Sequence, residues 1–454
     1  EEKEEEEEEE EGGAEDESVG TSSLVKCERD DLLLTAEVCS AQKLKDYVLL
    51  SALGQRLLPE VEKAPKEMLL RTGSAFASLG VLHPELFQAL AKGWLHLWNG
   101  DAAPESIGEL AEVASSFSKQ RVRHEELLDK LGERLELAGG ASKATPQEAL
   151  SLMHSFAFLR LSSSLGETWK ELEKKVMDQG LGKLSLPELS ELCYIFVLSR
   201  ESDSRQDELC EMLKVLAGHV LNASPEYWKS PEGATVHKRV MLLRSVMRYM
   251  YKDAYKTQVP DSVVHAFRKL HRMERPNTTI KPAVNFTRKL STILRKMRIG
   301  HIVNAEAGPF TFDIVERDRK LVYECLHFDR YYAGTIEKIE TMCLQERVVK
   351  AMGYRIVSIP HWQWNKIKHR RQRAEYLRMS RYYAIKDNRE LMPRDDVPFD
   401  TALNPFDFMG EFFFKKERPS SAWSWFQPRY DYRRRLPGAA ALESESAKPQ
   451  NLSA

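Results

Sequence analysis

Basic and aromatic side chains alternate in the stretch that follows Trp364. Between residues 366 and 381, the only acid is Glu375. Arginine forks pair with phosphate and tyrosine rings stack on nucleobases, so this combination suits single-stranded RNA. The predicted contacts are Lys366, Lys368, Arg370, Arg371, Arg373, Tyr376, Arg378 and Arg381, with Trp362 and Trp364 immediately upstream. Of the two tryptophans, we expect one to pack in the core and the other to be available on the surface.

A second basic stretch precedes it, at residues 281–298. No acid lies between Lys281 and Arg298, and residues 283–297 have the spacing of a helix. A basic helix is often no more than a solvated face, but uncompensated positive charge repels itself and favours an anionic partner. The predicted contacts here are Arg288, Lys289, Arg295, Lys296 and Arg298.

The segment 393–437 is interrupted by prolines yet rich in aromatic residues. Disordered chains are poor in aromatic residues, so we expect something to order this segment. It either packs on the rest of the chain or docks into a large ribonucleoprotein. In the second case, phosphate contacts are predicted from Lys415, Lys416, Arg433, Arg434 and Arg435.

The remaining composition limits the function classes. The formal net charge is -2, but the charge is segregated, because Glu4 to Glu11 form an acidic run typical of a disordered segment. No cysteine pair has CxxC spacing, which indicates neither a disulfide framework nor a zinc site, and no cofactor motif is present. No apolar run approaches the length of a membrane span. Because the first residue is Glu1, we expect a processed or trimmed product.

The two basic stretches flank a small predicted α/β unit. Residues 310–315 and 320–326 are β-branched or aromatic runs separated by a charged turn, which predicts an antiparallel hairpin. Residues 336–352 carry apolar side chains at helical spacing, and Gly353 suits the helix end. A further strand at 356–359 ends at Pro360, because proline cannot continue a central ladder.

This unit resembles the RAP domain, a module of organellar RNA-binding proteins that is abundant in apicomplexan parasites. The resemblance covers about residues 309–385. It is carried by Phe312, Asp313, Val322 to Glu324, His327, Phe328, Arg347, Gly353, Tyr354, Val357, Ile359, Pro360 and a tryptophan. One departure is that only Cys325 and Leu326 stand where the family usually has a glycine-containing turn.

RAP domains are thought to be related to the restriction-endonuclease-like fold, so the resemblance raises the question of RNA cleavage. That chemistry uses two carboxylates to hold a divalent metal and a lysine two residues after the second acid. Asp313 and Glu324 match the carboxylates, but Leu326 occupies the lysine position. His327 is the candidate substitute base. We therefore expect no catalytic site and no bound metal, with a metal-dependent endoribonuclease as the alternative.

A repeat of about 40 residues organises the chain before residue 274. Four phenylalanines mark it: Phe76, Phe117, Phe156 and Phe196. This period is typical of stacked helical hairpins, and we expect these rings to pack between neighbouring helices. The repeats resemble the octotricopeptide-like repeats that precede RAP domains in related proteins. Such a solenoid offers an extended surface to RNA or to a long protein segment.

The sequence thus predicts a mainly α chain, in which a helical-hairpin solenoid precedes an α/β domain of restriction-endonuclease type. The predicted boundaries are 1–30 for an acidic disordered segment, 31–274 for the repeats, 275–300 for a basic linker helix, 301–392 for the RAP-like domain, 393–437 for the basic aromatic extension and 438–454 for a disordered end. We expect a non-catalytic, mitochondrial RNA-binding protein with no membrane partner. It is either a structural subunit of the mitochondrial ribosome contacting rRNA or a factor for organellar RNA stability and processing.

Overall fold

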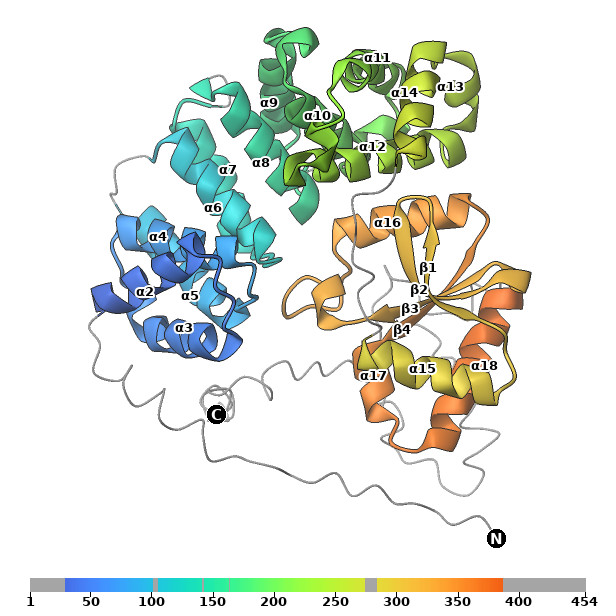
Figure 1. The fold of residues 1–454 in the computed structure, drawn as a ribbon. Helices are drawn as coiled ribbons and strands as arrows, with labels where there is room; N and C mark the ends of the chain where they lie inside the picture. Colours follow the sequence, from blue (N-terminus) through green and yellow to red (C-terminus); the bar gives the residue numbers. More distant parts are fainter. Residues whose placement is uncertain (1–28, 101–104, 141–142, 163, 274–283, 387–454) are drawn as a thin grey trace, which may run out of the picture.

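The computed structural model describes residues 29–100, 105–140, 143–162, 164–273 and 284–386. They form a helical solenoid (residues 29–273) and an α/β unit (residues 284–386), and Figure 1 shows the solenoid as an arc beside that unit. The predicted mainly α fold class is confirmed. The acidic segment and the basic aromatic extension lie outside the described residues.

The solenoid is built from helix pairs in which first and second helices alternate. The first helices are α2 (Arg29–Ala41), α4 (Lys66–Leu79), α6 (Ile107–Lys119), α8 (Pro146–Leu159), α10 (Leu186–Leu198) and α12 (Pro231–Tyr249). The second helices are α3 (Tyr47–Val61), α5 (Pro84–Trp98), α7 (Glu125–Leu137), α9 (Gly166–Asp178) and α11 (Gln206–Asn222), and α13 (Lys252–Thr257) and α14 (Asp261–Arg272) follow α12. Short turns η2 (Leu181–Lys183), η3 (Glu201–Asp203) and η4 (Tyr227–Lys229) lie between them.

The first helices pack side by side in chain order, α4 on α6, α6 on α8, α8 on α10 and α10 on α12. The sequence fixes where three of them begin, because Ser106, Thr145 and Ser185 each form a capping box with a glutamate three residues later. The four marker phenylalanines of the repeat are fully buried between neighbouring helices, which confirms the predicted period.

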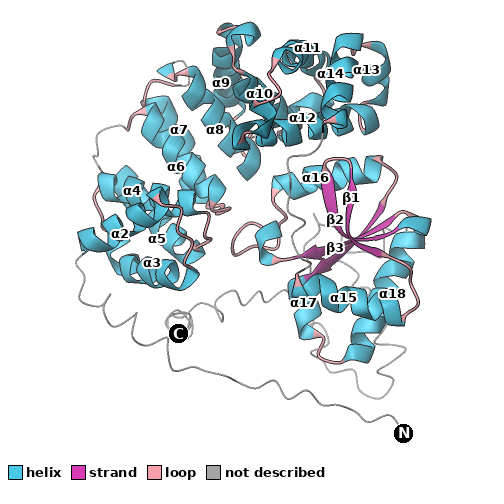
Figure 2. Cartoon of the chain, in the orientation of Figure 1, coloured by secondary structure: helices cyan, strands magenta, loops and turns pink. Residues whose placement is uncertain are grey.

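The α/β unit contains the strands of the described chain, gathered in one sheet (Figure 2). Its elements are α15 (Asn285–Lys296), β1 (Ile302–Ala307), β2 (Phe310–Glu316), η5 (Arg317–Arg319), β3 (Leu321–Leu326), η6 (Phe328–Arg330), α16 (Glu340–Ala351), β4 (Arg355–Pro360), α17 (His361–Lys366) and α18 (Arg370–Lys386). The predicted hairpin is present, with Val315 paired to Val322. The sequence prediction missed β1, which pairs antiparallel with β2 at the sheet edge.

The strand order is β1-β2-β3-β4, and only β3 and β4 are parallel. Alternate residues of β3 face opposite layers, as a pleated strand requires. Leu321 and Tyr323 pack with α15 and α18, whereas Val322 and Leu326 pack toward α16 and the solenoid. The helix predicted as a basic linker is therefore one layer of the α/β unit, and not a separate connection.

The opposite layer, α16, joins the unit to the solenoid. It contacts α8, α10 and α12, and its buried side chains belong to the same apolar core as the repeats. The predicted helix 336–352 begins later, at Glu340, because residues 328–339 form a turn and a loop that reach the solenoid instead. The first helices of the repeats thus line the side that faces the α/β unit, and α15 and α18 lie on the far side of the sheet.

Candidate nucleic-acid interface

α15 buries an apolar stripe and exposes a basic one. Phe286, Leu290 and Leu294 are buried against the sheet. The exposed cations of this segment are Arg288, Lys289, Arg295, Lys296 and Arg298. Seven residues separate Arg288 from Arg295 and Lys289 from Lys296, so each pair lies on one line, two helical turns apart. The predicted basic contacts of this helix are therefore turned toward solvent.

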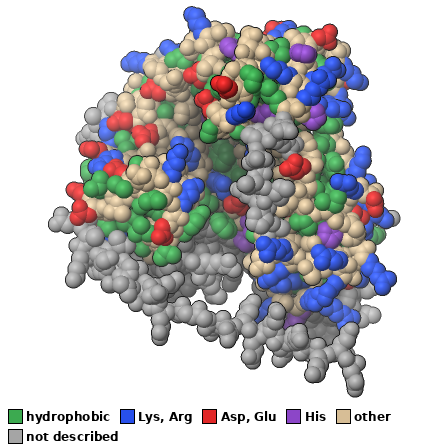
Figure 3. Space-filling model, in the orientation of Figure 1, with side chains coloured by type: hydrophobic (Ala, Val, Ile, Leu, Met, Phe, Trp, Pro, Cys, Tyr) green, Lys and Arg blue, Asp and Glu red, His purple; other side chains and the backbone are tan. Residues whose placement is uncertain are grey.

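The chain returns beside this stripe at the start of α18. Lys368, Arg370 and Arg371 are exposed there, and α15 packs against α18. Within the part of the chain that the structure describes, seven cations of the two segments have no ion pair or hydrogen bond of their side chains. We call them the basic face: Lys289, Arg295, Lys296, Arg298, Lys368, Arg370 and Arg371. Figure 3 shows Lys and Arg gathered over this end of the molecule, where Figure 1 places α15, α17 and α18.

Two of the predicted arginine contacts hold the fold together instead. Arg381 makes a bidentate pair with the buried Glu316, at 2.7 and 2.9 Å from its oxygens. Arg373 lies over the ring of Trp364, at 5.2 Å from the ring centroid, and donates a hydrogen bond of 2.7 Å to the carbonyl oxygen of Ile367. Neither guanidinium offers its full set of donors to a ligand.

The aromatic contacts predicted for the same stretch are buried. Trp362 is 8% exposed and Trp364 is 2% exposed, so the expectation that one of them is available on the surface is wrong. Tyr376 is also buried, and its hydroxyl donates to the Gln363 side chain at 2.9 Å. Trp364 and Tyr376 pack in the core between the sheet and α15, α17 and α18, whereas Trp362 packs on Tyr331, at 4.5 Å between ring centroids, in the core shared with the solenoid. On α18, the exposed aromatic ring is Tyr382, four residues beyond Arg378 on the same helix face.

The other predicted contacts are partly engaged or undescribed. Arg378 is exposed and pairs with Glu375 at 2.8 Å, while Arg288 and Lys366 have interactions of their own. The remaining predicted contacts, Lys415, Lys416, Arg433, Arg434 and Arg435, lie outside the described residues.

The two acids that match a nuclease pattern are not arranged as metal ligands. Asp313 accepts a hydrogen bond from the Cys325 amide at 2.9 Å, and its burial raises the pKa of its carboxyl group. Glu324 is 3% exposed, and neither of its oxygens has a hydrogen-bond donor among the described residues. Burial, together with the neighbouring Glu346, raises the pKa of Glu324 to about 8.

A lysine that sequence reasoning missed lies in this buried cluster. Lys338, from the loop before α16, donates to Glu346 at 2.5 Å and to the Ser358 hydroxyl at 3.2 Å. Its ammonium group is therefore committed to a structural pair. Leu326, at the position of the nuclease lysine, is buried in the core, and burial lowers the pKa of His327. Among the described residues, no three side chains of His, Cys, Asp or Glu come together to hold a metal ion.

Comparison with protein families agrees with this geometry. Residues 323–379 match the family model of the RAP domain. The α/β unit contains a RAP domain. Such a domain is generally an RNA-binding domain, and the match points to an RNA-binding role. The matched residues run from β3 to α18 and include part of the basic face. No curated protein matches the chain.

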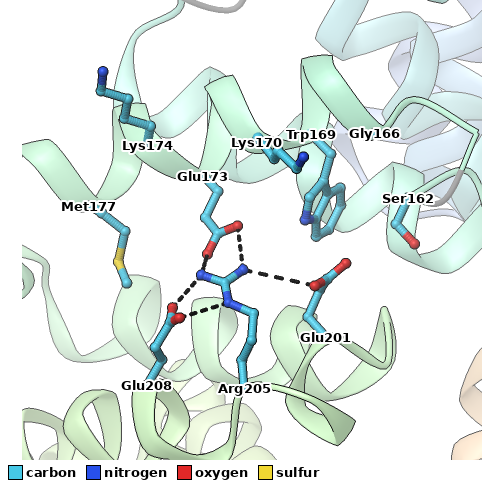
Figure 4. Close-up of a pocket in the computed structure, with 10 residues that line it drawn as sticks. All are labelled: Ser162, Gly166, Trp169, Lys170, Glu173, Lys174, Met177, Glu201, Arg205 and Glu208. Carbon is cyan, nitrogen blue, oxygen red and sulfur yellow. Dashed lines mark hydrogen bonds and ion pairs between the residues drawn. The ribbon is translucent and has the colours of Figure 1, made fainter.

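A surface hollow lies away from the RAP domain, on the solenoid between α9 and α11. It has a volume of about 610 Å³ and is drawn in Figure 4. Its centre is Arg205, which pairs with Glu173 at 2.6 Å and with Glu208, and lies 3.8 Å from Glu201. Arg205 ties the two helices together through these glutamates, so the hollow is a structural joint. Among the helices described, none combines the length and apolar character needed to cross a membrane.

Proposed function

We propose that this protein binds single-stranded RNA without cleaving it, through the basic face beside its RAP domain. The observation that carries the proposal is the set of seven exposed cations without an acidic partner among the described residues. In water, such side chains contribute little to folding stability. They do gain free energy when they replace the counterions of a phosphate backbone.

The shape of the surface supports a single strand as the ligand. The cations come from two adjacent helices and the residues that flank them, on one layer of the α/β unit, with the exposed Tyr382 ring on α18. Arginine and lysine without carboxylate neighbours bind a phosphate backbone, and an exposed ring stacks on any base. This combination favours affinity over sequence specificity.

We further propose a mitochondrial location and a place in the mitochondrial ribosome, as a structural subunit that contacts rRNA. The support is the sequence of the extension, in which Phe412, Phe413, Phe414, Trp423, Trp425 and Phe426 accompany the cations Lys415 and Lys416. Such aromatic residues suit docking into a ribonucleoprotein. A factor that stabilises or processes organellar transcripts remains the alternative, because the basic face suits both roles.

The RNA-binding proposal is tested by the salt dependence of affinity for a labelled single-stranded RNA. The variant Lys368→Gln/Arg370→Gln/Arg371→Gln should lower the slope of log affinity against log salt by about 2, since each lost phosphate contact removes roughly 0.7. The matched control is Lys170→Gln/Lys174→Gln/Lys183→Gln, which removes three exposed lysines of the solenoid and should leave the slope unchanged. Equal slopes for the wild type and the first variant would contradict the proposal.

The two roles are separated by sedimentation of the tagged protein with mitochondrial ribosomal subunits at low and high salt. If this protein is a structural component of the mitochondrial ribosome, it should stay with the ribosomal particles at both salt concentrations. Deletion of residues 405–437 should release it without changing the melting temperature. A protein that leaves the particles at high salt, or never joins them, is a free RNA-binding factor.

Cleavage is tested separately, with a labelled RNA and magnesium or manganese at stoichiometric protein concentration. We expect the RNA to stay intact. Cleavage that disappears in Glu324→Ala would establish the endoribonuclease reading instead.

A further inference from the structure

In five successive repeats, a residue one or two positions after the end of the first helix has the left-handed backbone conformation. Lys43, Gly80, Arg121, Arg160 and Arg200 all have positive φ, between 54° and 67°. Glycine is the ordinary choice at this position, because a side chain there is strained. Four of the five repeats nevertheless carry a long cation. Strain that is kept in this way points to a use for the side chain.

The three arginines of this series form a row that we call the arginine ladder: Arg121, Arg160 and Arg200. They are 39 and 40 residues apart and come from consecutive repeats. Each follows its marker phenylalanine by four residues, so the ladder has the phase of the repeat itself. All three side chains reach the same part of the chain, the segment 329–340, which runs from η6 to the first residue of α16.

The contacts are specific in geometry. Arg121 donates to the carbonyl oxygen of Asp329, and the Ala333 amide donates back to the Arg121 carbonyl oxygen at 2.8 Å. Arg160 donates to the Glu340 carboxylate at 2.6 Å and to the Lys338 carbonyl oxygen at 2.9 Å. Arg200 donates to the other Glu340 oxygen at 3.3 Å.

Glu340 is the centre of this interface. Its side chain is 3% exposed, and Arg347 lies 3.8 Å from it in addition to the two ladder arginines. Beside it, Tyr332 is buried, donates to the Phe158 carbonyl oxygen and packs edge to face on the Phe158 ring. A buried carboxylate is stable only when its charge is neutralised and its oxygens are bonded, and here the repeats supply both.

We propose that the arginine ladder is a docking site whose ligand is the segment 329–340 of this same chain. The ladder holds the α/β unit against the first helices of the repeats, so that the basic face points away from the solenoid. The strained backbone is retained because it places the ladder side chains where they reach Glu340 and its neighbours. It follows that these guanidinium groups are already bonded and do not form a track for RNA phosphates.

The test uses the fact that glycine should relieve the strain at these positions. If the arginines merely end helices, Arg160→Gly and Arg200→Gly will keep or raise the melting temperature. Docking predicts the opposite: a lower melting temperature, and amide hydrogen exchange in α16 faster by on the order of tenfold. Lys43→Gly is the matched control, because Lys43 has the same backbone but an exposed side chain without a partner among the described residues, and it should not lower the melting temperature.

A double-mutant cycle isolates the contact. In a Glu340→Gln background, Arg200→Gly should no longer accelerate exchange in α16, because its ligand is gone. Arg200, whose side chain is 54% exposed, is the mild variant if Arg160→Gly fails to fold. Additive effects in the cycle would overturn the proposal. So would a salt slope for RNA that falls in Arg200→Gly as it does in the basic-face variant, because the ladder would then be an RNA site.

Discussion

Arginines on the two sides of the α/β unit have opposite surroundings. On the solenoid side, Arg160 and Arg200 meet the buried carboxylate of Glu340. On the far side, Arg370 and Arg371 are exposed and meet no acid among the described residues. The same residue type therefore builds an interface in one place and is left for a ligand in the other. What decides the role is whether a carboxylate lies within reach.

The difference follows from the medium around each charge. The buried carboxylate of Glu340 depends on the arginines around it, because it has lost its hydration and its charge needs a partner. An exposed guanidinium keeps its hydration and loses little when it has no partner. Arg160 and Arg200 therefore contribute to folding stability. Arg370 and Arg371 can exchange water and counterions for phosphate.

The largest expected effect comes from removing the buried carboxylate. Glu340→Ala removes the buried carboxylate that Arg160, Arg200 and Arg347 share, which should cost about 3 kcal/mol of unfolding free energy, the low end for a broken buried pair because these arginines are partly exposed. Chemical denaturation measures this change. The control is Glu62→Ala, whose side chain is half exposed and pairs with Lys92 at 3.0 Å, with an expected cost below about 1 kcal/mol. Similar small losses in both variants would remove the distinction between the two sides.

A second comparison stays within α18, where the two kinds of arginine are ten residues apart. Arg381→Gln breaks the bidentate pair with buried Glu316 and should cost about 2 kcal/mol of stability, with almost no change in the RNA salt slope. Arg371→Gln should change stability by less than about 0.5 kcal/mol and lower the slope by about 0.7. Chemical denaturation of both variants measures the stability change, and RNA titration at several salt concentrations measures the slope. A large slope change for Arg381→Gln would show that structural pairing does not exclude RNA contact.

The last comparison follows stability with pH and concerns a buried acid whose oxygens have no hydrogen-bond partner among the described residues. Burial raises the pKa of Glu324 to about 8, above the value of about 4.3 in an unfolded chain. Between these values the folded state holds a proton that the unfolded state has released, so stability falls as pH rises from 5 to 8. The expected slope is about 1 kcal/mol per pH unit, and it should disappear in Glu324→Gln. A wild type whose stability does not fall in this range would show that Glu324 is ionised when buried.

Much of the fold could be predicted from local patterns. The β-branched runs express a rule that acts over a few residues, and the phenylalanine period repeats one local helix pair along the chain. β1 was missed because Ile302–Ala307 is an edge strand with half-buried residues and no strong alternation. α15 was taken as a linker because its basic residues are conspicuous, whereas its contact with the sheet depends on residues far along the chain.

The sequence predicted which types of residue form the candidate site, but not which individual residues are exposed there. A count of cations cannot tell Arg371 from Arg381, because the acid that pairs with Arg381 is 65 residues earlier. The tryptophans were divided between core and surface without knowledge that two helices cover that face of the sheet. The arginine ladder, by contrast, left a visible signal. Arg121, Arg160 and Arg200 recur in phase with the phenylalanines, and a search of the repeat for periodic charge would have found them.

The docking of one loop across three consecutive repeats constrains how the gene for this protein can change. Inserting or deleting a helix pair between α6 and α10 would move one arginine out of reach of the segment 329–340. A pair added ahead of α4 would leave all three contacts in place. Repeat arrays usually change length by gain or loss of whole units. In this array, the number of units between α6 and α10 is constrained, because three of them contact one segment more than a hundred residues later in the chain. Length variation among related genes should therefore concentrate at the amino-terminal end of the array.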